Sequence, residues 1–225
     1  MASDQKLVHA TACAIIEKLN AGEVTPLDLL DVLEQRIAEV DGKVNALPTL
    51  CFDRARDRAK ILMKKPAGER GLLAGMPIPI KDLTNVEGVL TTQGSPIYKD
   101  NVPARSDLLV EQLEHHGGLI YAKSNTPEFG AGANTFNEVF GATLNPWDLS
   151  RSAAGSSGGA AVALATGMAW LAHGTDMGGS LRNPASFCGV VGMRPSIGRV
   201  PHSPVAKIDR NLGVHGPMAD RKSVV

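Results

Sequence analysis

Residues 151–189 read R-S-A-A-G-S-S-G-G-A-A-V-A-L-A-T-G-M-A-W-L-A-H-G-T-D-M-G-G-S-L-R-N-P-A-S-F-C-G. Two turns rich in glycine and serine, at 155–159 and 174–180, flank a segment of small and apolar residues. No charged residue occurs between Arg151 and Asp176. Because an exposed linker normally carries solvated side chains, this pattern predicts a segment packed inside the protein.

The second turn predicts a site for a negatively charged oxygen. Gly178 and Gly179 directly precede Ser180. Glycine permits positive φ and a close approach of other groups, so several backbone N–H groups in this turn can point toward one position. Such a nest stabilises an oxygen that becomes anionic during a reaction. Ser180 is therefore a candidate nucleophile, provided that a base lies nearby.

Other interpretations of the glycine-rich turns have less support. G-S-S-G-G at 155–159 matches the G-x-S-x-G nucleophile elbow, but residues 148–154 before it do not form a β-branched strand. Neither glycine-rich phosphate-binding motif is present. The uncharged run is long enough to span a membrane, but glycine, serine, threonine and alanine dominate its first half, which disfavours a transmembrane helix.

A candidate base is Lys81, which follows an uncharged run at 71–80. This run is apolar with two prolines, and it predicts an irregular strand that delivers Lys81 to the edge of a sheet. A lysine at a strand end is usually exposed. One that emerges inside the fold tends to lose its proton, because desolvation disfavours the charged amine. A neutral lysine can act as a general base, so a serine hydrolase can work without histidine.

Patterns elsewhere predict helices alternating with strands. Helices are expected at 7–19, from Pro26 with Thr25 as its N-cap, at 52–63, and after Ser106 or Asp107. Short strands are expected at 45–50 and 119–123. The strand–helix–strand order around 72–123 implies a parallel or mixed sheet flanked by helices. Residues 124–148 predict an irregular segment.

Several blocks in a fixed order resemble the amidase signature family. They are the G-S-S-G-G turn, G-T-D-x-G-G-S-x-R at 174–182, P-A-x-F-C-G at 184–189, and the lysine motif G-M-P-I-P-I-K-D at 75–82. The resemblance spans nearly the whole chain, as far as G-P-M-A at 216–219. It implies an α/β fold with a mixed, mostly parallel central sheet flanked by helices.

The resemblance also implies a reaction and a set of roles. The family hydrolyses a carboxylic amide to an acid and ammonia or an amine, without cofactor or metal, and has a cis peptide before its bridging serine, here Gly155-Ser156. The family often has a similar Thr-Gly-Ser segment near its site, so two interpretations of residues 91–95 are open: a substrate contact and an ordinary loop. The implied roles are nucleophile for Ser180, bridging serine for Ser156, base for Lys81, oxyanion or substrate binding for Met177, Gly178 and Gly179, and support for Ser157, Asp176 and Arg182.

Two features bear on which member of the family this is. Thr126-Pro127 stands where the A-type component of the transfer-RNA amidotransferases carries methionine-aspartate, which favours the amidase branch. The family continues well beyond residues 216–219, so the chain is expected to hold the N-terminal half to two-thirds of one domain, with a helical region at 1–65 and a catalytic core at 70–225. A silent remnant or interaction subunit, an amidotransferase A-type subunit, a homo-oligomer and a complementing C-terminal half remain open.

Composition narrows the partners. The chain has 23 basic and 23 acidic residues and only 4% aromatics, which argues against a nucleic-acid or anionic-membrane surface. The partner that the family resemblance implies is a small-molecule amide. Three scattered cysteines and a polar N-terminus indicate a cytoplasmic protein. His115-His116 lacks a recognisable ligand set, so no metal is expected. A Ser-His-Asp triad remains open, although no spacing supports it.

Overall fold

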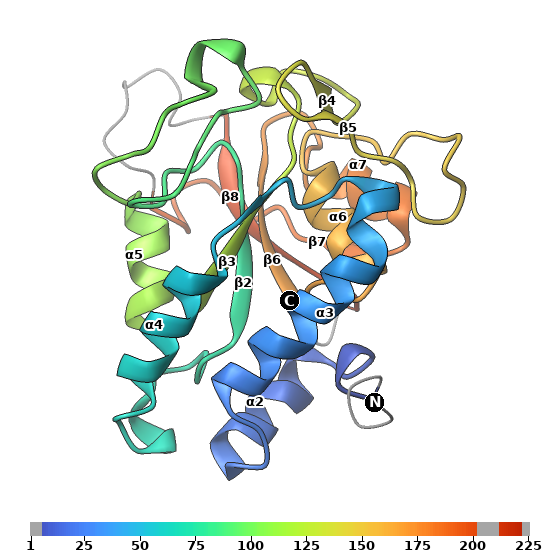
Figure 1. Cartoon of the computed structure of the whole chain (residues 1–225). Helices are drawn as coiled ribbons and strands as arrows, with labels where there is room; N and C mark the ends of the chain where they lie inside the picture. Colours follow the sequence, from blue (N-terminus) through green and yellow to red (C-terminus); the bar gives the residue numbers. More distant parts are fainter. Residues whose placement is uncertain (1–5, 202–211, 222–225) are drawn as a thin grey trace.

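A computed structural model describes residues 6–201 and 212–221. Strands occupy its centre, and helices cover them on the outside (Figure 1). One sheet has the order β1-β3-β2 and another the order β6-β8-β7. Strand β6 lies beside β2, so the two sheets meet at the middle of the molecule. The strands are β1 (Thr49–Leu50), β2 (Pro77–Lys81), β3 (Leu119–Ser124), β4 (Phe136–Asn137), β5 (Gly141–Ala142), β6 (Leu171–Asp176), β7 (Val191–Gly192) and β8 (Val214–Ala219).

The described α-helices range from the 7 residues of α7 to the 19 residues of α3. The α-helices are α2 (Ala12–Ala21), α3 (Pro26–Val44), α4 (Phe52–Leu62), α5 (Leu108–His115), α6 (Gly158–Ala165) and α7 (Arg182–Cys188). Short 3₁₀ turns occur at η1 (Ala67–Glu69), η2 (Pro96–Tyr98) and η3 (Glu128–Gly130).

Capping decides where the first two of these helices begin. The helix predicted at 7–19 is divided, because the side chain of Thr11 accepts the N–H of Ala14 and starts α2 at Ala12. The predicted start of the next helix is confirmed. Thr25 and Asp28 exchange side-chain hydrogen bonds in a capping box, and Pro26 occupies the first turn of α3.

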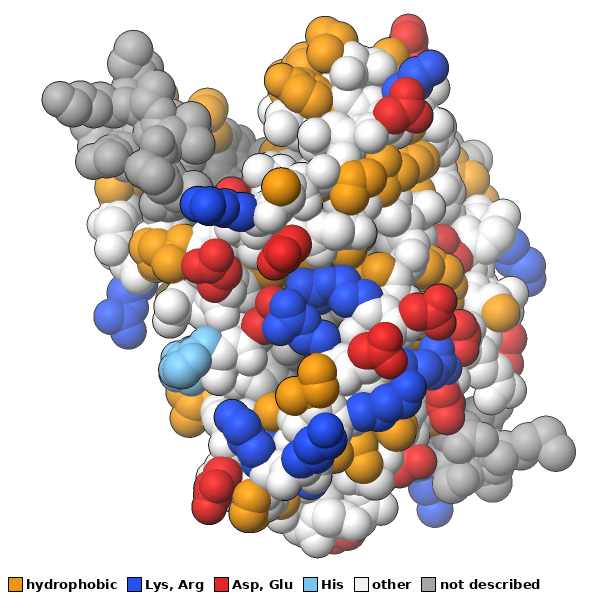
Figure 2. Space-filling view, turned by 60° about the vertical axis from the view of Figure 1, so that its left-hand side comes forward, with side chains coloured by type: hydrophobic (Ala, Val, Ile, Leu, Met, Phe, Trp, Pro, Cys, Tyr) orange, Lys and Arg blue, Asp and Glu red, His pale blue; other side chains and the backbone are white. Residues whose placement is uncertain are grey.

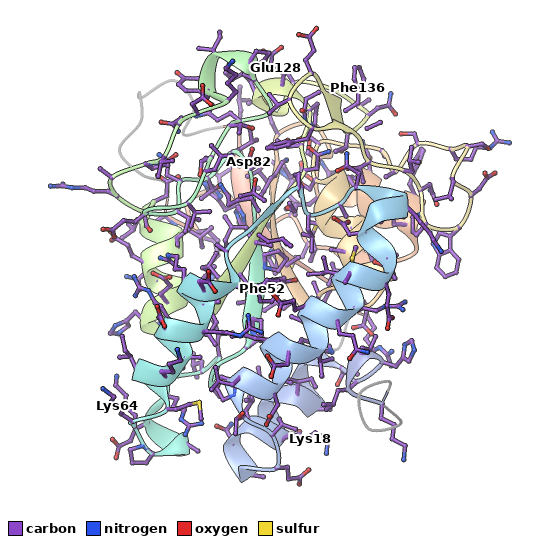
Figure 3. The ribbon with its side chains drawn as sticks, viewed as in Figure 1. Lys18, Phe52, Lys64, Asp82, Glu128 and Phe136 are labelled. Atoms are coloured by element: carbon purple, nitrogen blue, oxygen red, sulfur yellow. The ribbon has the colours of Figure 1, made fainter. Side chains whose placement is uncertain are left out.

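Helix α4 carries its charges on a solvated face. Arg56 binds Asp31 and Glu34 of α3 at 2.7 Å each, and Lys60 lies 3.1 Å from Asp57. Figure 2 shows basic and acidic side chains interleaved on this face, without a patch of one sign. On the buried side, Phe52 packs against Tyr121 of β3 with ring centroids 5.5 Å apart (Figure 3).

The predicted strand–helix–strand unit is confirmed. Strands β2 and β3 are parallel, and α5 connects them on the outside. The sheet is mixed, as expected, but its parallel share is smaller than the resemblance implied. Among the described strands β2–β3 is the parallel pairing, while β1–β3, β4–β5, β6–β8 and β7–β8 are antiparallel. Strand β6 follows α6, and β8 comes later in the chain, after α7 and β7. Strand β8 runs back beside β6 in the opposite direction, which makes this pairing antiparallel.

The uncharged segment after the first serine turn forms a short buried helix. Helix α6 is eight residues long and its first seven residues are buried, so it packs inside the protein as predicted. Glycine permits this packing, because a Cβ on Gly159 would meet Asn125 N at 2.3 Å and Ala46 O at 2.5 Å. In the described part of the chain, no helix combines the length and apolarity needed to cross a bilayer.

Candidate active site

The ends of β2 and β6 bring the two sequence blocks together. Lys81 is the last residue of β2, and Thr175 and Asp176 are the last two of β6. The backbone N–H of Lys81 donates to Nδ1 of His173 on β6 at 3.3 Å, which fixes the two strands relative to each other. Residues nearly a hundred positions apart in the sequence therefore meet at one edge of the strands.

Lys81 is fully buried, and its amine is surrounded by hydroxyl groups. Nζ lies 2.6 Å from Ser156 Oγ, 3.0 Å from Ser157 Oγ and 2.9 Å from Thr175 Oγ1. The peptide bond between Gly155 and Ser156 is cis, as the resemblance implied. The structure thus brings two of the three predicted catalytic residues, Lys81 and Ser156, into direct hydrogen-bond contact.

The surroundings of Lys81 favour its neutral form. Burial lowers the pKa of Lys81 from 10.5 to about 7, although the negative charge of Asp176 opposes the shift. Three hydroxyl partners suit either protonation state. An ammonium donates to all three, whereas a neutral amine donates to two and accepts a proton from the third.

The hydroxyl protons distinguish the two neighbouring serines. Ser157 Oγ donates to the carbonyl oxygen of Thr175 at 3.3 Å and accepts the N–H of Thr175 at 3.3 Å. Ser157 therefore offers Lys81 an acceptor. Among the described residues, the Ser156 hydroxyl has no hydrogen-bond partner besides Lys81. Of the two serines, Ser156 is thus the one whose hydroxyl can give its proton to a neutral Lys81 amine.

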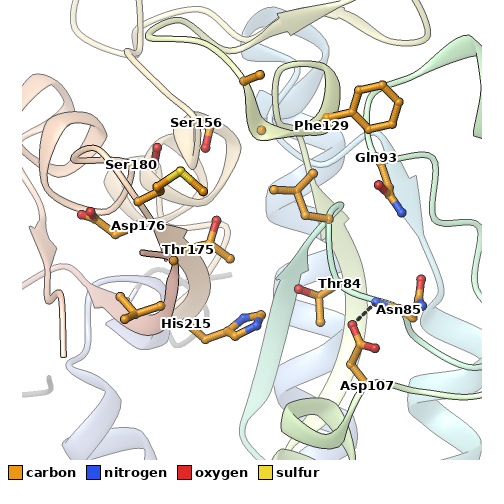
Figure 4. Close-up of a pocket in the computed structure, with 16 residues that line it drawn as sticks. Thr84, Asn85, Gln93, Asp107, Phe129, Ser156, Thr175, Asp176, Ser180 and His215 are labelled. Atoms are coloured by element: carbon orange, nitrogen blue, oxygen red, sulfur yellow. Dashed lines mark hydrogen bonds between the residues drawn. The ribbon is translucent and has the colours of Figure 1, made fainter. Parts of the chain in front are cut away.

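Ser180 lies at a pocket of about 470 Å³ together with Ser156. Figure 4 shows both serines on the same side of this pocket, with Thr175 beside them. The N–H of Ser157 donates to the backbone carbonyl of Ser180 at 3.2 Å, which holds the two glycine-rich turns together. The described residues that line the pocket are Leu83, Thr84, Asn85, Gln93, Asp107, Phe129, Gly130, Ala131, Ser156, Thr175, Asp176, Met177, Ser180, Gly213, Val214 and His215.

Asp176 anchors the turn that carries Ser180. Its carboxylate accepts the N–H groups of Gly179 at 2.9 Å and Leu181 at 3.1 Å, and both Arg182 and Arg194 lie 3.0 Å from it. Burial alone would raise the pKa of Asp176, but these hydrogen bonds outweigh burial and hold the pKa well below 3.8.

The same contacts change the expected set of oxyanion donors. The N–H of Gly179 is used by Asp176, so Gly179 is not an available donor in this structure. Met177 and Gly178 are exposed, and Ser180 is half-buried. Within residues 6–201 and 212–221, no hydrogen bond uses the N–H of Gly178 or Ser180. The N–H groups of Gly178 and Ser180 are therefore free to bind an oxyanion in the turn where the sequence predicted anion binding, and Met177 lies next to them in the chain.

Several functional contacts were not predicted from the sequence. Thr175 belongs to the 174–182 motif, but the sequence predicted no role for it. In the structure its Oγ1 accepts a hydrogen bond from Nζ of Lys81. His173 Nε2 lies 2.8 Å from His215 Nδ1, and the two rings stack. Burial, followed by the nearby charges of His215 and Lys81, lowers the pKa of His173 well below 6.5. No spacing signal identifies such a pair, because the partners come from two strands that are distant in sequence.

Within the described ranges, no three His, Cys, Asp or Glu side chains lie close enough together to hold an ion. His115 and His116 stack edge to face at the end of α5, away from the serine pocket.

Comparison with known proteins identifies the family. The amidase family model matches residues 28–224. The acylamidase of Rhodococcus erythropolis is 39% identical over 220 residues, covering 96% of this chain and 46% of that protein. The A-type component of the glutamyl-tRNA(Gln) amidotransferase of Anaeromyxobacter dehalogenans (strain 2CP-C) is 42% identical over 201 residues, covering 88% of this chain and 41% of that protein.

The fold comparison agrees. The structure of 6-aminohexanoate cyclic dimer hydrolase complexed with substrate superposes with a TM-score of 0.87 and 32% identity, over 95% of this chain and 44% of that one. The chain spans less than half the length of these relatives. Because the family model matches residues 28–224 and the fold superposes on solved structures of that family, the chain belongs to the amidase signature family.

Proposed function

We propose that the chain hydrolyses a carboxylic amide through an acyl-enzyme on Ser180, with Ser156 and Lys81 as the proton relay. The contact that carries this proposal is the 2.6 Å separation of Lys81 Nζ and Ser156 Oγ in a fully buried environment. The lowered pKa of Lys81, about 7, supports a substantial neutral fraction at neutral pH. Such an amine is a general base suited to its working pH.

The proposed acylation step moves one proton along this chain. Ser156 transfers its proton to neutral Lys81 and takes one from Ser180. The Ser180 oxygen bonds to the amide carbon, and the carbonyl oxygen becomes anionic. The N–H groups of Met177, Gly178 and Ser180 are the proposed donors to this oxygen, and one such donor typically contributes about 3 kcal/mol to transition-state stabilisation.

The intermediate then collapses and the enzyme is regenerated. The carbon–nitrogen bond breaks, and the proton held by Lys81 returns through Ser156 to the leaving ammonia or amine. A water molecule attacks the acyl-enzyme, releases the carboxylic acid and restores the Ser180 hydroxyl. Ser157, Asp176 and Arg182 act as supports in this proposal, because they hold Lys81 and the Ser180 turn in position.

Trapping of the acyl group tests the proposal. Wild-type protein incubated with an amide and hydroxylamine is expected to form a hydroxamate, and Ser180→Ala is expected to form none. Intact-mass measurement after a fluorophosphonate label should show one adduct on the wild type and none on Ser180→Ala. Hydroxamate formation by Ser180→Ala at the wild-type rate would contradict the assignment of the nucleophile.

An amidotransferase A-type subunit is the second candidate, because relatives of that kind match at 40–42% identity. Thr126-Pro127 stands where the family resemblance implies methionine-aspartate for an A-type subunit, which favours a free-standing amidase. The two candidates differ in substrate and partner. Hydrolysis of simple amides by the purified chain supports the first, whereas activity restricted to glutamine and co-purification with a transfer-RNA-binding partner support the second.

A further inference from the structure

The wall of the pocket opposite the two serines contains an unsatisfied hydroxyl group. Thr84 lines the pocket and is only 1% exposed. Its Oγ1 is buried and has no hydrogen-bond partner among the described residues. In Figure 4, Thr84 faces the side of the pocket that carries Ser156 and Ser180. A buried hydroxyl without a partner costs about 1–3 kcal/mol, so its retention at a pocket wall calls for a ligand that satisfies it.

A buried ion pair fixes the position of Thr84. Lys123 Nζ donates to the backbone carbonyl of Thr84 at 2.9 Å, to Asp82 Oδ1 at 3.1 Å and to Thr91 Oγ1 at 2.7 Å. Lys123 and Asp82 are both fully buried, and Asp82 lies just beyond the upper end of β2 (Figure 3). All three protons of the ammonium are therefore used to hold this wall in place.

Gln93 is held on the same wall by its backbone. Its N–H donates to the carbonyl of Asp82 at 3.0 Å, and its own carbonyl accepts the N–H of Phe129 at 2.8 Å. Its φ is 54°, in the left-handed region that disfavours a residue with a side chain. The two backbone hydrogen bonds hold Gln93 in this conformation. The Gln93 side chain lines the pocket on the side of Thr84 and Asn85 (Figure 4).

We propose that Thr84 and Gln93 form a specificity site for a second, uncharged hydrogen-bonding group of the amide substrate. This inference rests on the proposed amidase function and names the substrate class: amides whose acyl chain carries another carboxamide. The Thr84 hydroxyl and the Gln93 carboxamide each offer a donor and an acceptor, which matches a carboxamide. The described residues that line the pocket include no lysine or arginine.

The test compares amides of equal length with and without the second group. Hydrolysis of succinamide and adipamide is measured against butyramide and hexanamide, with correction for the two equivalent amides of each diamide. The wild type is expected to favour at least one diamide over its monoamide by about tenfold in kcat/KM, because a site built for a hydrogen bond rejects the analogue that lacks it.

Substitutions of Thr84 and Gln93 test whether these residues cause the preference for diamides. Thr84→Val and Gln93→Leu are each expected to lower the diamide-to-monoamide ratio by about three- to tenfold. Thr84→Ser keeps a hydroxyl and is expected to retain most of the ratio. Thr49→Val is the matched control, because Thr49 Oγ1 is also buried without a partner but does not line the pocket. Its ratio should equal that of the wild type.

A binding measurement separates failure of this inference from failure of the proposed function. Calorimetry on Ser180→Ala is expected to show tighter binding of adipamide or succinamide than of the matched monoamide, with the difference lost when Thr84→Val is added. If no amide is turned over but this binding difference persists, the specificity site stands and the proposed reaction fails. Equal kcat/KM and equal binding for diamides and monoamides, or ratios unchanged in both Thr84→Val and Gln93→Leu, would overturn the inference.

Discussion

Lys81 and Ser157 lie 3.0 Å apart, measured from Nζ to Oγ, although the proposed relay does not pass through Ser157. Ser157 Oγ also contacts both backbone groups of Thr175 at 3.3 Å. Its proton is thereby directed to the Thr175 carbonyl, and the amine of Lys81 is held between Ser157 and Ser156. In the proposed mechanism, Ser157 positions the Lys81 amine and Ser156 passes the proton.

The first prediction follows from this division. Ser156→Ala removes the group that passes the proton and is expected to lower kcat/KM by about 10²–10⁴-fold. Ser157→Ala removes one uncharged hydrogen bond to Lys81 and is expected to cost about tenfold. Steady-state kinetics on one amide measures both. Losses of equal size would mean that both serines carry the proton.

The second prediction concerns the pH dependence of activity. Because the neutral form of Lys81 is the proposed base and its pKa is about 7, kcat/KM is expected to rise as the pH increases from 5.5 to 8.5, with half its maximum near pH 7. The fluorophosphonate labelling rate of Ser180 should follow the same curve, since it reports the same activated hydroxyl. A labelling rate independent of pH across this range would exclude Lys81 as the titrating base.

A third prediction tests the same lysine through stability. Between about pH 7 and 10.5 the unfolded chain holds a proton on Lys81 that the folded chain lacks, so this residue makes the free energy of unfolding rise with pH. Below pH 7 Lys81 is protonated in both the folded and the unfolded chain, so its contribution to the free energy of unfolding no longer changes with pH. Any stability advantage of Lys81→Met over the wild type should therefore shrink by about 1.4 kcal/mol per pH unit above pH 7.

Urea unfolding of the two proteins at pH 6, 7, 8 and 9 measures this slope. Lys81→Met also leaves three hydroxyls without their amine partner, which adds a cost that does not depend on pH. The slope is therefore the informative quantity. Lys18→Met, on an exposed residue paired with Glu23, should run parallel to the wild type across the same range.

Local signals explain which parts of the fold were predictable from sequence. The helix start at Thr25-Pro26 and the β2-α5-β3 unit follow from local patterns, and both were predicted correctly. The reciprocal bond to Asp28 was not predicted. The burial of Lys81 was also inferable, because ten uncharged residues precede it.

The parts of the fold and the site that were not predicted depend on contacts between segments distant in sequence. The pairs Lys123–Asp82, Arg194–Asp176 and His173–His215 join residues that no local pattern connects. Lys123 was recognised as part of a strand, but its burial depends on Asp82 reaching it from the neighbouring strand end. The antiparallel pairing of β6 with β8 likewise depends on the path of the chain between them.

The fourth prediction concerns Asp176 and the turn that it anchors. Asp176→Asn removes the charge that pairs with Arg182 and Arg194 and is expected to lower the free energy of unfolding by about 3 kcal/mol at pH 7. Since the pKa of Asp176 is held below 3.8 in the folded protein, its stabilising effect is present above that pH and declines below it. Urea unfolding at pH 7, 5 and 3.5 should show the difference between variant and wild type narrowing at the lowest pH. Asp148→Asn, in an exposed loop, should show little change.

The fifth prediction compares two glycines in the serine-rich turns. A Cβ on Gly159 would lie 2.3 Å from Asn125 N and 2.5 Å from Ala46 O, and both are backbone atoms that cannot move aside cheaply. Gly159→Ala is therefore expected to destabilise the fold by several kcal/mol, about 3 or more. A Cβ on Gly178 meets no atom within 4 Å, so the free energy of unfolding of Gly178→Ala should lie within about 0.5 kcal/mol of the wild-type value. Thermal and urea unfolding test the pair, and a Gly159→Ala protein as stable as Gly178→Ala would show that α6 does not pack as closely against Ala46 and Asn125 as the structure places it.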